Sequence, residues 1–243
     1  MTLEIQPLSS GLSLSMNGND QYTKMLLHCN GADASTTFAD SARIGTAKTV
    51  TANGNAQVDT AQSKFGGASC LLDGTGDYLS IPTSSDFDFA SGDFTIDFWV
   101  RPNALSGHEG LASINNAALT SGGYFVEFDN AGAPSAPLRV YVTYTDATTT
   151  DTYATGGFST GTWYHIAFVR SGSNFYIFVD GVQKATWSSA KQLKDAPNGM
   201  VIGRLYTDSA GNFNGWIDEF RVTKGYARWT AAFTPPTRAY GDS

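Results

Sequence analysis

Charged residues are scarce in this sequence of 243 residues: they make up 15%, with 15 lysines and arginines against 22 aspartates and glutamates. The net charge is −7 and no cluster of five or more basic residues is present, so nucleic acid is not an expected partner. No apolar run approaches the roughly 18 residues of a membrane-spanning helix, so we expect a soluble chain without membrane insertion. The 13% of aromatic residues argues against a disordered chain.

Cysteine is also rare. Cys29 and Cys70 each lie in an apolar run, and we predict two buried free thiols, with a disulfide between them left open. The first residues carry neither the basic nor the apolar segment that begins a secretory signal. The sequence therefore predicts folding in a reducing cytosol, or a chain that lacks its signal.

Familiar catalytic and metal-binding motifs are absent from the sequence. It has no Cys/His cluster with zinc spacing, no EF-hand loop, no Gly-x-Ser-x-Gly elbow and no phosphate-binding glycine loop. His28 and His165 fall in predicted strands, where we expect half-buried, hydrogen-bonded side chains. His108 falls in a predicted solvated loop.

The sequence does have a strong two-residue hydrophobic period. In the segment FTIDFWV at 94–100, apolar residues share one face, and Thr95, Asp97 and Trp99 share the other. Asp180-Gly181 between two β-rich runs predicts a tight hairpin turn, because glycine accepts a positive φ. Further strands are predicted at 124–129, 138–144, 163–170, 175–182, 200–203 and 216–222. Many short strands separated by Gly- and Asn-rich turns predict an all-β sandwich or barrel.

The first 21 residues differ in composition, since they are rich in turn residues and poor in large apolar ones. We predict an extended N-terminal arm over 1–21 and a single β-sandwich domain over 22–243. The arm is either a frayed terminus or a segment that docks on a neighbouring subunit.

Four ordered motifs resemble the laminin G-like domains of the concanavalin A-like lectin/glucanase superfamily. They are FGGASCLLDGTGDYLSIP at 65–82, FTIDFWVRP at 94–102, WYHIAFVR at 163–170 with FVDGV at 178–182, and GWIDEFRV at 215–222. The tail, GYARW at 225–229 with FTPP at 233–236, resembles the ending of such domains in phage structural proteins. The resemblance implies a jelly-roll sandwich of two curved antiparallel sheets. It also implies ligands on the concave face or in the loops at one rim, in some relatives with calcium.

Hydrolysis is poorly supported by the carboxylates. Glucanases of this superfamily carry Glu-x-Asp-x-(x)-Glu on one strand, and Glu127-Phe128-Asp129 supplies only the first half. Asp218 and Glu219 are adjacent and point to opposite faces of a strand, so they do not form a catalytic pair. If Trp216 and Phe220 face the core, Asp218 faces it too, and we expect it to cap backbone amides of an adjacent loop. We predict no enzymatic activity.

Sugar binding needs aromatic platforms with polar groups beside them. The candidate sugar-binding residues are Trp187, Tyr206, Asp208 and Tyr153. Packing roles are expected for Trp99, Trp163, Trp216 and Trp229. Asp73 and Asp77 are candidate calcium ligands, although we favour solvated turn residues there, and no other cofactor is predicted.

These features predict a non-catalytic recognition and assembly module, a phage virion protein on the tail or head surface that binds carbohydrate or other host-surface material. A decoration or fibre subunit without a ligand is the first alternative, and a glycan hydrolase is the second. We expect a homo-oligomer that contacts other virion proteins through residues 1–21. An extracellular or cell-surface location is the alternative to the virion.

Overall fold

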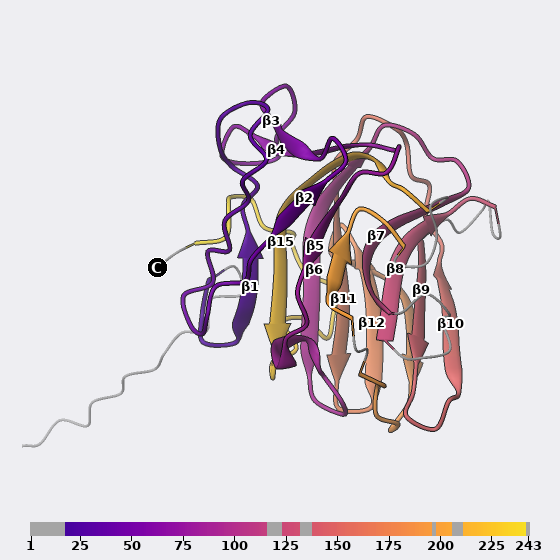
Figure 1. Cartoon of the computed structure of the whole chain (residues 1–243). Helices are drawn as coiled ribbons and strands as arrows, with labels where there is room; N and C mark the ends of the chain where they lie inside the picture. The colour runs from indigo at the N-terminus through magenta and orange to yellow at the C-terminus, as the bar shows by residue number, and fades with distance from the viewer. Residues whose placement is uncertain (1–17, 116–122, 132–137, 196–197, 206–210, 242–243) are drawn as a thin grey trace, which may run out of the picture.

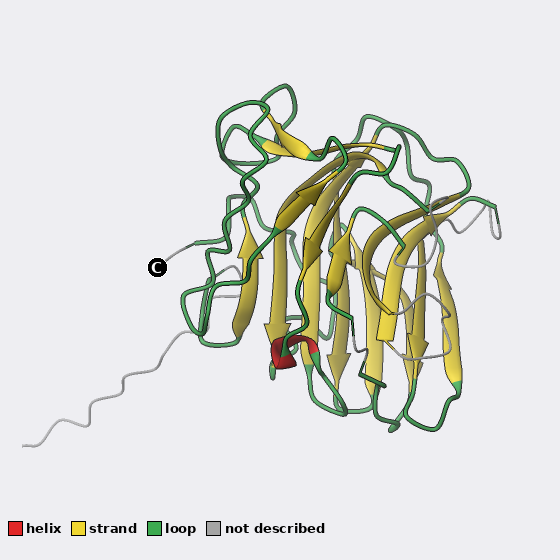
Figure 2. Cartoon of the chain, in the orientation of Figure 1, coloured by secondary structure: helices red, strands yellow, loops and turns green. Residues whose placement is uncertain are grey.

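Two antiparallel β-sheets packed face to face form the described part of the chain (Figures 1 and 2). The computed structural model describes residues 18–115, 123–131, 138–195, 198–205 and 211–241. Within these ranges the one helix is a 3-10 turn, η1 (Ser85–Phe87), and none is long and apolar enough to cross a membrane. The predicted all-β jelly-roll sandwich is confirmed.

The larger sheet has eight strands. They are β1 (Thr23–Leu27), β3 (Gln57–Asp59), β4 (Ser69–Asp73), β6 (Phe94–Pro102), β11 (Tyr164–Ser171), β12 (Asn174–Val179), β13 (Val182–Ser188) and β15 (Asn214–Lys224). Their order is β13-β12-β11-β6-β15-β4-β3, and β15 pairs with β4 along its first half and with β1 along its second.

The smaller sheet has seven strands. They are β2 (Thr51–Asn53), β5 (Tyr78–Ile81), β7 (His108–Asn115), β8 (Gly123–Asp129), β9 (Leu138–Thr143), β10 (Thr149–Ala154) and β14 (Met200–Ile202). Their order is β10-β9-β8-β7-β14-β5-β2. In Figure 1, β7 and β8 bend strongly beside the straighter β9 and β10.

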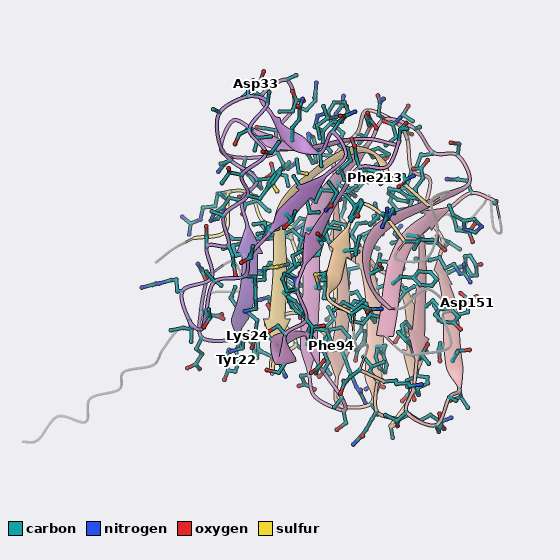
Figure 3. All side chains as sticks on the ribbon, in the orientation of Figure 1. Tyr22, Lys24, Asp33, Phe94, Asp151 and Phe213 are labelled. Carbon is teal, nitrogen blue, oxygen red and sulfur yellow. The ribbon has the colours of Figure 1, made fainter. Side chains whose placement is uncertain are left out.

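The apolar core fills the space between the two sheets. Phe94, Ile96, Phe98 and Val100 of β6 are fully buried in it, so the predicted alternation of this strand is confirmed (Figure 3 labels Phe94). In β8 the alternate residues at 124, 126 and 128 face the same core. The residues between them therefore point out of the sandwich, since successive strand residues face opposite sides.

The predicted hairpin at Asp180-Gly181 is confirmed. Asp180 and Gly181 have φ angles of 49° and 74°, and Val179 pairs with Val182 across the turn. Two successive positive φ angles match the twist of the flanking strands. A Cβ atom on Gly181 would collide with the backbone carbonyl of Phe233, so this turn is also the place where the C-terminal segment is docked.

A β-bulge in β15 overturns one predicted face. Asp218 pairs with Trp99 but Arg221 pairs with Asp97, so two residues of β15 oppose one of β6, and Glu219 has a φ of 51°. The bulge shifts the alternation, as bulges do. Trp216 and Asp218 consequently lie on the outer face of the larger sheet while Phe220 is in the core, and the prediction that they share one face is wrong.

Asp218 nevertheless has the predicted capping role. Its Oδ2 accepts hydrogen bonds from the backbone N–H groups of Lys64, at 2.8 Å, and Phe65, at 3.0 Å. Asp218 is fully buried. Its burial raises the pKa of the carboxyl to about 7, opposed by the two backbone hydrogen bonds and reinforced by the charge of Glu219.

The C-terminal segment covers the outer face of the larger sheet. Trp229 and Phe233 stack at 4.0 Å between ring centres, and Trp229 is buried in a second apolar cluster with Ala167, Val169 and Phe178. The expected packing role of Trp229 is therefore confirmed. Of the predicted arm, residues 1–17 lie outside the described residues. Gly18 forms a parallel bridge with Gly241, so the described start of the chain lies against its described end.

A buried polar network lies beneath this segment. Asp97 receives Arg221 Nε at 3.0 Å and Nη2 at 2.9 Å, together with the Tyr240 hydroxyl at 2.5 Å. His165 Nε2 lies 3.1 Å from the same hydroxyl. The prediction of a half-buried, hydrogen-bonded histidine is wrong in part: His165 is fully buried, and its Nδ1 has no hydrogen-bond partner among the described residues. Burial alone would raise the pKa of Asp97, but the Arg221 guanidinium holds it well below the usual range. The network ties β6, β11, β15 and the C-terminal segment together.

The two thiols are free and buried, as predicted. Burial raises the pKa of both Cys29 and Cys70, which keeps them protonated.

Trp99 is also a packing residue: it meets the Phe65 ring edge-on at 5.9 Å, and Lys64 Nζ lies 3.8 Å from its centre.

Candidate functional site

The outer face of the smaller sheet carries an unusual group of charged and aromatic side chains. Phe125, Glu127 and Asp129 of β8 point outward because Tyr124, Val126 and Phe128 occupy the core. The register places Arg139 of β9 opposite Glu127 and Tyr141 opposite Phe125. On the edge strand β10, Tyr153 pairs with Arg139 and Asp151 with Tyr141. We call these residues, with His108, the β7–β10 site; Figure 3 labels Asp151 at its edge.

Arg139 lies at the centre of the β7–β10 site. Its Nε and Nη2 donate to the two carboxylate oxygens of Asp151, both at 2.8 Å, and its Nη1 donates to Glu127 Oε1 at 2.9 Å. This paired geometry is the strongest that an arginine makes with a carboxylate. The hydrogen bond to Asp151 raises the pKa of Arg139, so the guanidinium is fixed as a cation.

Three aromatic rings surround that guanidinium. Its central carbon lies 5.2 Å from the ring centre of Phe125, 5.8 Å from Tyr141 and 5.6 Å from Tyr153. Phe125 and Tyr141 are stacked at 5.1 Å with only 5° between their planes. The Tyr153 hydroxyl donates to Asp129 Oδ2 at 3.2 Å. Phe125 is buried, so the partly exposed rings of Tyr141 and Tyr153 are the ones that this face presents beside the fixed charges.

The two carboxylates of β8 are buried, although they point away from the core. Glu127 is 0% and Asp129 1% exposed, whereas His108 is 45% exposed. Burial raises the pKa of Glu127, and the hydrogen bond and charge of Arg139 oppose that shift. His108 Nδ1 lies 3.3 Å from Glu127 Oε2 and 3.4 Å from Asp129 Oδ1. The prediction of a loop at His108 is wrong, since this residue begins β7 and pairs with Asp129, but its side chain is exposed as expected.

Of the other sugar-binding candidates, Trp187 is not brought to this site. Trp187 of β13 stacks on Phe175 at 4.8 Å with 3° between the planes, and its Nε1 donates to the Tyr144 hydroxyl at 3.1 Å. One ring face of Trp187 is therefore used for packing against the core. Tyr206 and Asp208 lie outside the described residues. Of the two candidates among the described residues, Tyr153 is the one that belongs to the β7–β10 site.

The candidate calcium ligands are occupied by backbone amides. Asp77 is fully buried, and its Oδ2 accepts the N–H of Asp73 at 2.8 Å while its Oδ1 accepts the N–H of Asn55 at 2.5 Å. Asp73 Oδ1 accepts the N–H of Thr75 at 2.7 Å. These bonds are those of a stabilised turn. In this structure these oxygens therefore hold the backbone of the loop.

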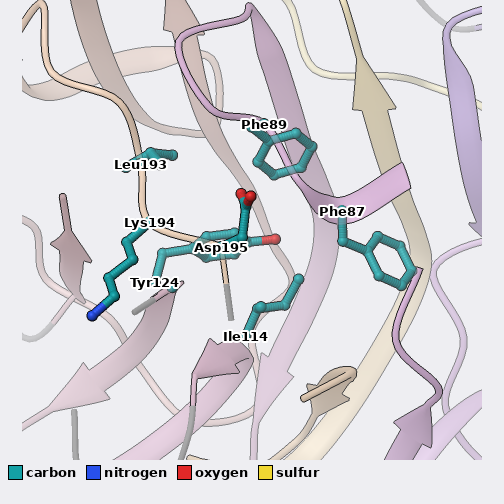
Figure 4. A pocket seen from close by; sticks show the side chains of 8 residues that line it. Phe87, Phe89, Ile114, Tyr124, Leu193, Lys194 and Asp195 are labelled. Carbon is teal, nitrogen blue, oxygen red and sulfur yellow. The ribbon is translucent and has the colours of Figure 1, made fainter. Parts of the chain in front are cut away.

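One small cavity lies between the sheets, close to η1 (Figure 4). Its volume is about 10 Å³, and its lining includes Phe87, Phe89, Tyr124 and Leu193. The buried Tyr124 hydroxyl has no hydrogen-bond partner among the described residues. The space is that of one water molecule, not of a sugar.

The chain belongs to the concanavalin A-like lectin/glucanases superfamily, because the laminin G family model of that description matches residues 73–228, more than half of the chain. A search of curated proteins finds no relative.

Solved structures share this fold. The binding domain of Paraclostridial Mosquitocidal Protein 1 has a TM-score of 0.66 at 15% identity, covering 88% of this chain and 51% of that one. The binding domain of botulinum neurotoxin serotype G has a TM-score of 0.63 at 14% identity, covering 84% of this chain and 48% of that one. A third structure is domain 4 of AbnA, a GH43 extracellular arabinanase from Geobacillus stearothermophilus, in complex with arabinotriose. It has a TM-score of 0.59 at 18% identity, covering 88% of this chain and 95% of that one. The chain spans about half the length of the toxin binding domains, and at these identities the likeness shows the fold alone.

Sequence reasoning found only part of the β7–β10 site. The spacing of Glu127 and Asp129 placed both on one face of a strand, and that is where the structure has them. Arg139, Asp151 and His108 were missed, because they come from three other strands and meet β8 only through the pairing register. The available signal was weak: an Arg or Asp on the polar positions of neighbouring predicted strands.

Proposed function

We propose that this protein is a non-catalytic carbohydrate-binding module and that it binds sugar at the β7–β10 site. The observation that carries the proposal is the fixed guanidinium of Arg139, 18% exposed and set among three aromatic rings on the outer face of a sheet. Aromatic rings pack against the apolar faces of sugars, while guanidinium and carboxylate groups bind their hydroxyls. The side chains are already held by one another, so little ordering is needed on binding.

The same contacts favour binding over hydrolysis. A retaining glycosidase needs one free carboxylate as nucleophile and one protonated carboxyl as acid. Glu127 is paired with Arg139 and faces His108, and Asp129 accepts hydrogen bonds from Tyr153 and from the N–H of Ala131. Both carboxylates therefore serve the architecture of the face in this proposal.

A glycan array tests the function. Wild-type protein, with and without calcium, should bind a restricted set of glycans, and Tyr153→Ala should weaken that binding by about tenfold or more, since a central aromatic contact contributes more than 1 kcal/mol. Tyr176→Ala is the matched control, because Tyr176 lies on β12 of the other sheet. A wild-type protein that binds no glycan would leave the ligand-free structural subunit as the better account.

Hydrolysis has its own assay. Release of reducing ends from β-glucans by the wild type, abolished in Glu127→Gln, would overturn the non-catalytic part of the proposal. No release from either protein is the expected result.

The setting we propose is the surface of a phage virion, on the tail or the head. The support is the segment 225–236, which resembles the ending of phage structural proteins and packs over the larger sheet through Trp229 and Phe233. In this setting the chain is a symmetric homo-oligomer, and the arm predicted over residues 1–21 contacts other virion proteins. Light scattering of the full chain and of a chain lacking residues 1–17 tests this: we expect an oligomer that dissociates on truncation, and a monomer in both cases would refute it.

A further inference from the structure

Three side chains of the β7–β10 site converge on one point that the contacts of Arg139 leave unused. Within the described part of the chain, His108, Glu127 and Asp129 form the one group of at least three potential metal ligands whose atoms lie within 4.8 Å of one another. Glu127 gives Oε1 to Arg139 and turns Oε2 toward His108. Asp129 turns Oδ2 toward Tyr153 and Oδ1 toward His108. Glu127 Oε2 and Asp129 Oδ1 thus both turn toward His108, and Asp129 Oδ1 also accepts the N–H of Ala131 at 3.1 Å.

A second observation concerns the free oxygen of the Glu127 carboxylate, which is not bonded to Arg139. Glu127 is 0% exposed, yet its Oε2 has no hydrogen-bond partner among the described residues. A buried carboxylate oxygen without a partner is costly, because it has lost its hydration and gained nothing in return. The nearest cationic group on that side is the partly exposed His108, at 3.3 Å.

The two separations that join His108 to the carboxylates match those around a small tetrahedral ion. Zinc binds nitrogen and carboxylate oxygen at about 2.0–2.2 Å, so two of its ligands lie roughly 3.3–3.6 Å apart. His108 Nδ1 lies 3.3 Å from Glu127 Oε2 and 3.4 Å from Asp129 Oδ1. These two separations agree with an imidazole nitrogen and a carboxylate oxygen bound to one ion, and all three ligand atoms lie within 4.8 Å of one another.

The local charge also suits a divalent cation. Glu127, Asp129 and Asp151 carry three negative charges, and Arg139, held by Asp151, supplies one positive charge. With a neutral imidazole the group keeps a net charge of −2. Imidazole and few ligands favour zinc and its transition-metal neighbours, whereas calcium takes six to eight oxygens.

We propose that His108, Glu127 and Asp129 form a site for a divalent transition metal ion of the zinc type, with three protein ligands. A tetrahedral ion held by three protein ligands has a fourth position for water or a ligand hydroxyl. In this proposal Asp151 and Arg139 are positioning residues that hold the second oxygen of Glu127 in place. The inference does not depend on carbohydrate binding, since the ion is held by protein atoms alone.

Isothermal titration of the chelator-treated full chain with Zn²⁺, without any sugar, tests the site. We expect one ion per chain in the wild type and an affinity lower by at least about 100-fold in His108→Ala, given that even partners of metal ligands contribute 10–100-fold. His108 is 45% exposed, so this variant should fold normally. Asp146→Asn, which removes an exposed carboxylate elsewhere, is the matched control and should bind as the wild type does.

Co²⁺ supplies a second readout, because a four-coordinate ion with nitrogen and oxygen ligands gives visible absorption that six-coordinate aqueous Co²⁺ lacks. The band should appear with the wild type, and Glu127→Gln should abolish it. Absence of saturable Zn²⁺ binding, unchanged binding in His108→Ala, or equal affinity for Ca²⁺ would overturn the proposal and leave an ordinary histidine–carboxylate contact. Because no glycan is present, either result leaves the sugar-binding test independent.

Discussion

Replacing Asp97 with asparagine should strongly destabilise the fold, because Asp97 compensates a fully buried guanidinium. Asp97 accepts two hydrogen bonds from Arg221 and one from the Tyr240 hydroxyl, and both Asp97 and Arg221 are 0% exposed. In Asp97→Asn one oxygen remains, and the new NH₂ group faces a donor. Arg221 retains the carbonyl of Gly18 at 3.1 Å, which does not replace the lost charge.

The magnitude follows from the burial. Breaking a buried ion pair by removing one partner costs about 3–5 kcal/mol in the free energy of unfolding. For a chain of this length each kcal/mol shifts the melting temperature by roughly 2–4 °C, so we expect a fall of about 6–20 °C in calorimetry at neutral pH. The pKa of Asp97 is depressed in the folded state. Its contribution is therefore present above the unfolded pKa of about 3.9 and is lost as the pH falls through and below that value.

Two comparisons make this prediction decisive. Asp146→Asn removes a carboxylate that is 49% exposed and paired with Lys191, and the melting temperature should barely change. The double variant Asp97→Asn/Arg221→Met should recover part of the stability, since the uncompensated charge is gone. A single Asp97→Asn variant as stable as Asp146→Asn at pH 7 would refute the reasoning.

Three further outcomes follow from other parts of the fold. The pKa of Asp218 is raised to about 7 in the folded state. Between about pH 4 and 7 the folded state therefore binds a proton that the unfolded state has lost, and the free energy of unfolding falls by up to about 1.4 kcal/mol per pH unit as the pH rises. Asp218→Asn should flatten that slope in urea titrations at several pH values, and an unchanged slope would contradict the assignment. Gly181→Ala should lower the unfolding free energy by at least about 1 kcal/mol, because Gly181 has a φ of 74° and its Cβ would meet the carbonyl of Phe233. Limited proteolysis should then cut the C-terminal segment sooner than in the wild type, and equal cleavage rates would argue against the docking role of this turn. Tyr240→Phe removes the hydroxyl between Asp97 and His165, so that Asp97 is left with one partner fewer. It should lower the unfolding free energy, measured in denaturant, by about 1–3 kcal/mol, and a neutral effect would show that the hydroxyl is dispensable.

The alternation of apolar residues and the identity of turn residues were enough to predict much of the fold. The alternation in 94–100 and the Asp180-Gly181 turn both depend on short stretches of chain, and both are confirmed. The rule failed at Glu219, a non-glycine residue with positive φ, because nothing in its side chain announces a bulge. One extra residue there moved Trp216 and Asp218 to the other side of the sheet.

The candidate site was harder to predict, since it depends on contacts between strands. Glu127 and Asp129 share a face by spacing alone. The roles of Arg139 and His108 depend on registers that the sequence does not encode locally. The packing of Trp187 also depends on a contact between strands, because one face of its ring stacks on Phe175 of the neighbouring strand.

The buried Asp97–Arg221 network and the β7–β10 site lie on opposite outer surfaces of the sandwich, with the apolar core between them. Side chains of the β7–β10 site can therefore be substituted, in evolution or by design, without disturbing the Asp97–Arg221 network that holds the C-terminal segment on the other surface. Among descendants of this sequence, the residues of the β7–β10 site should change faster than those of the Asp97–Arg221 network.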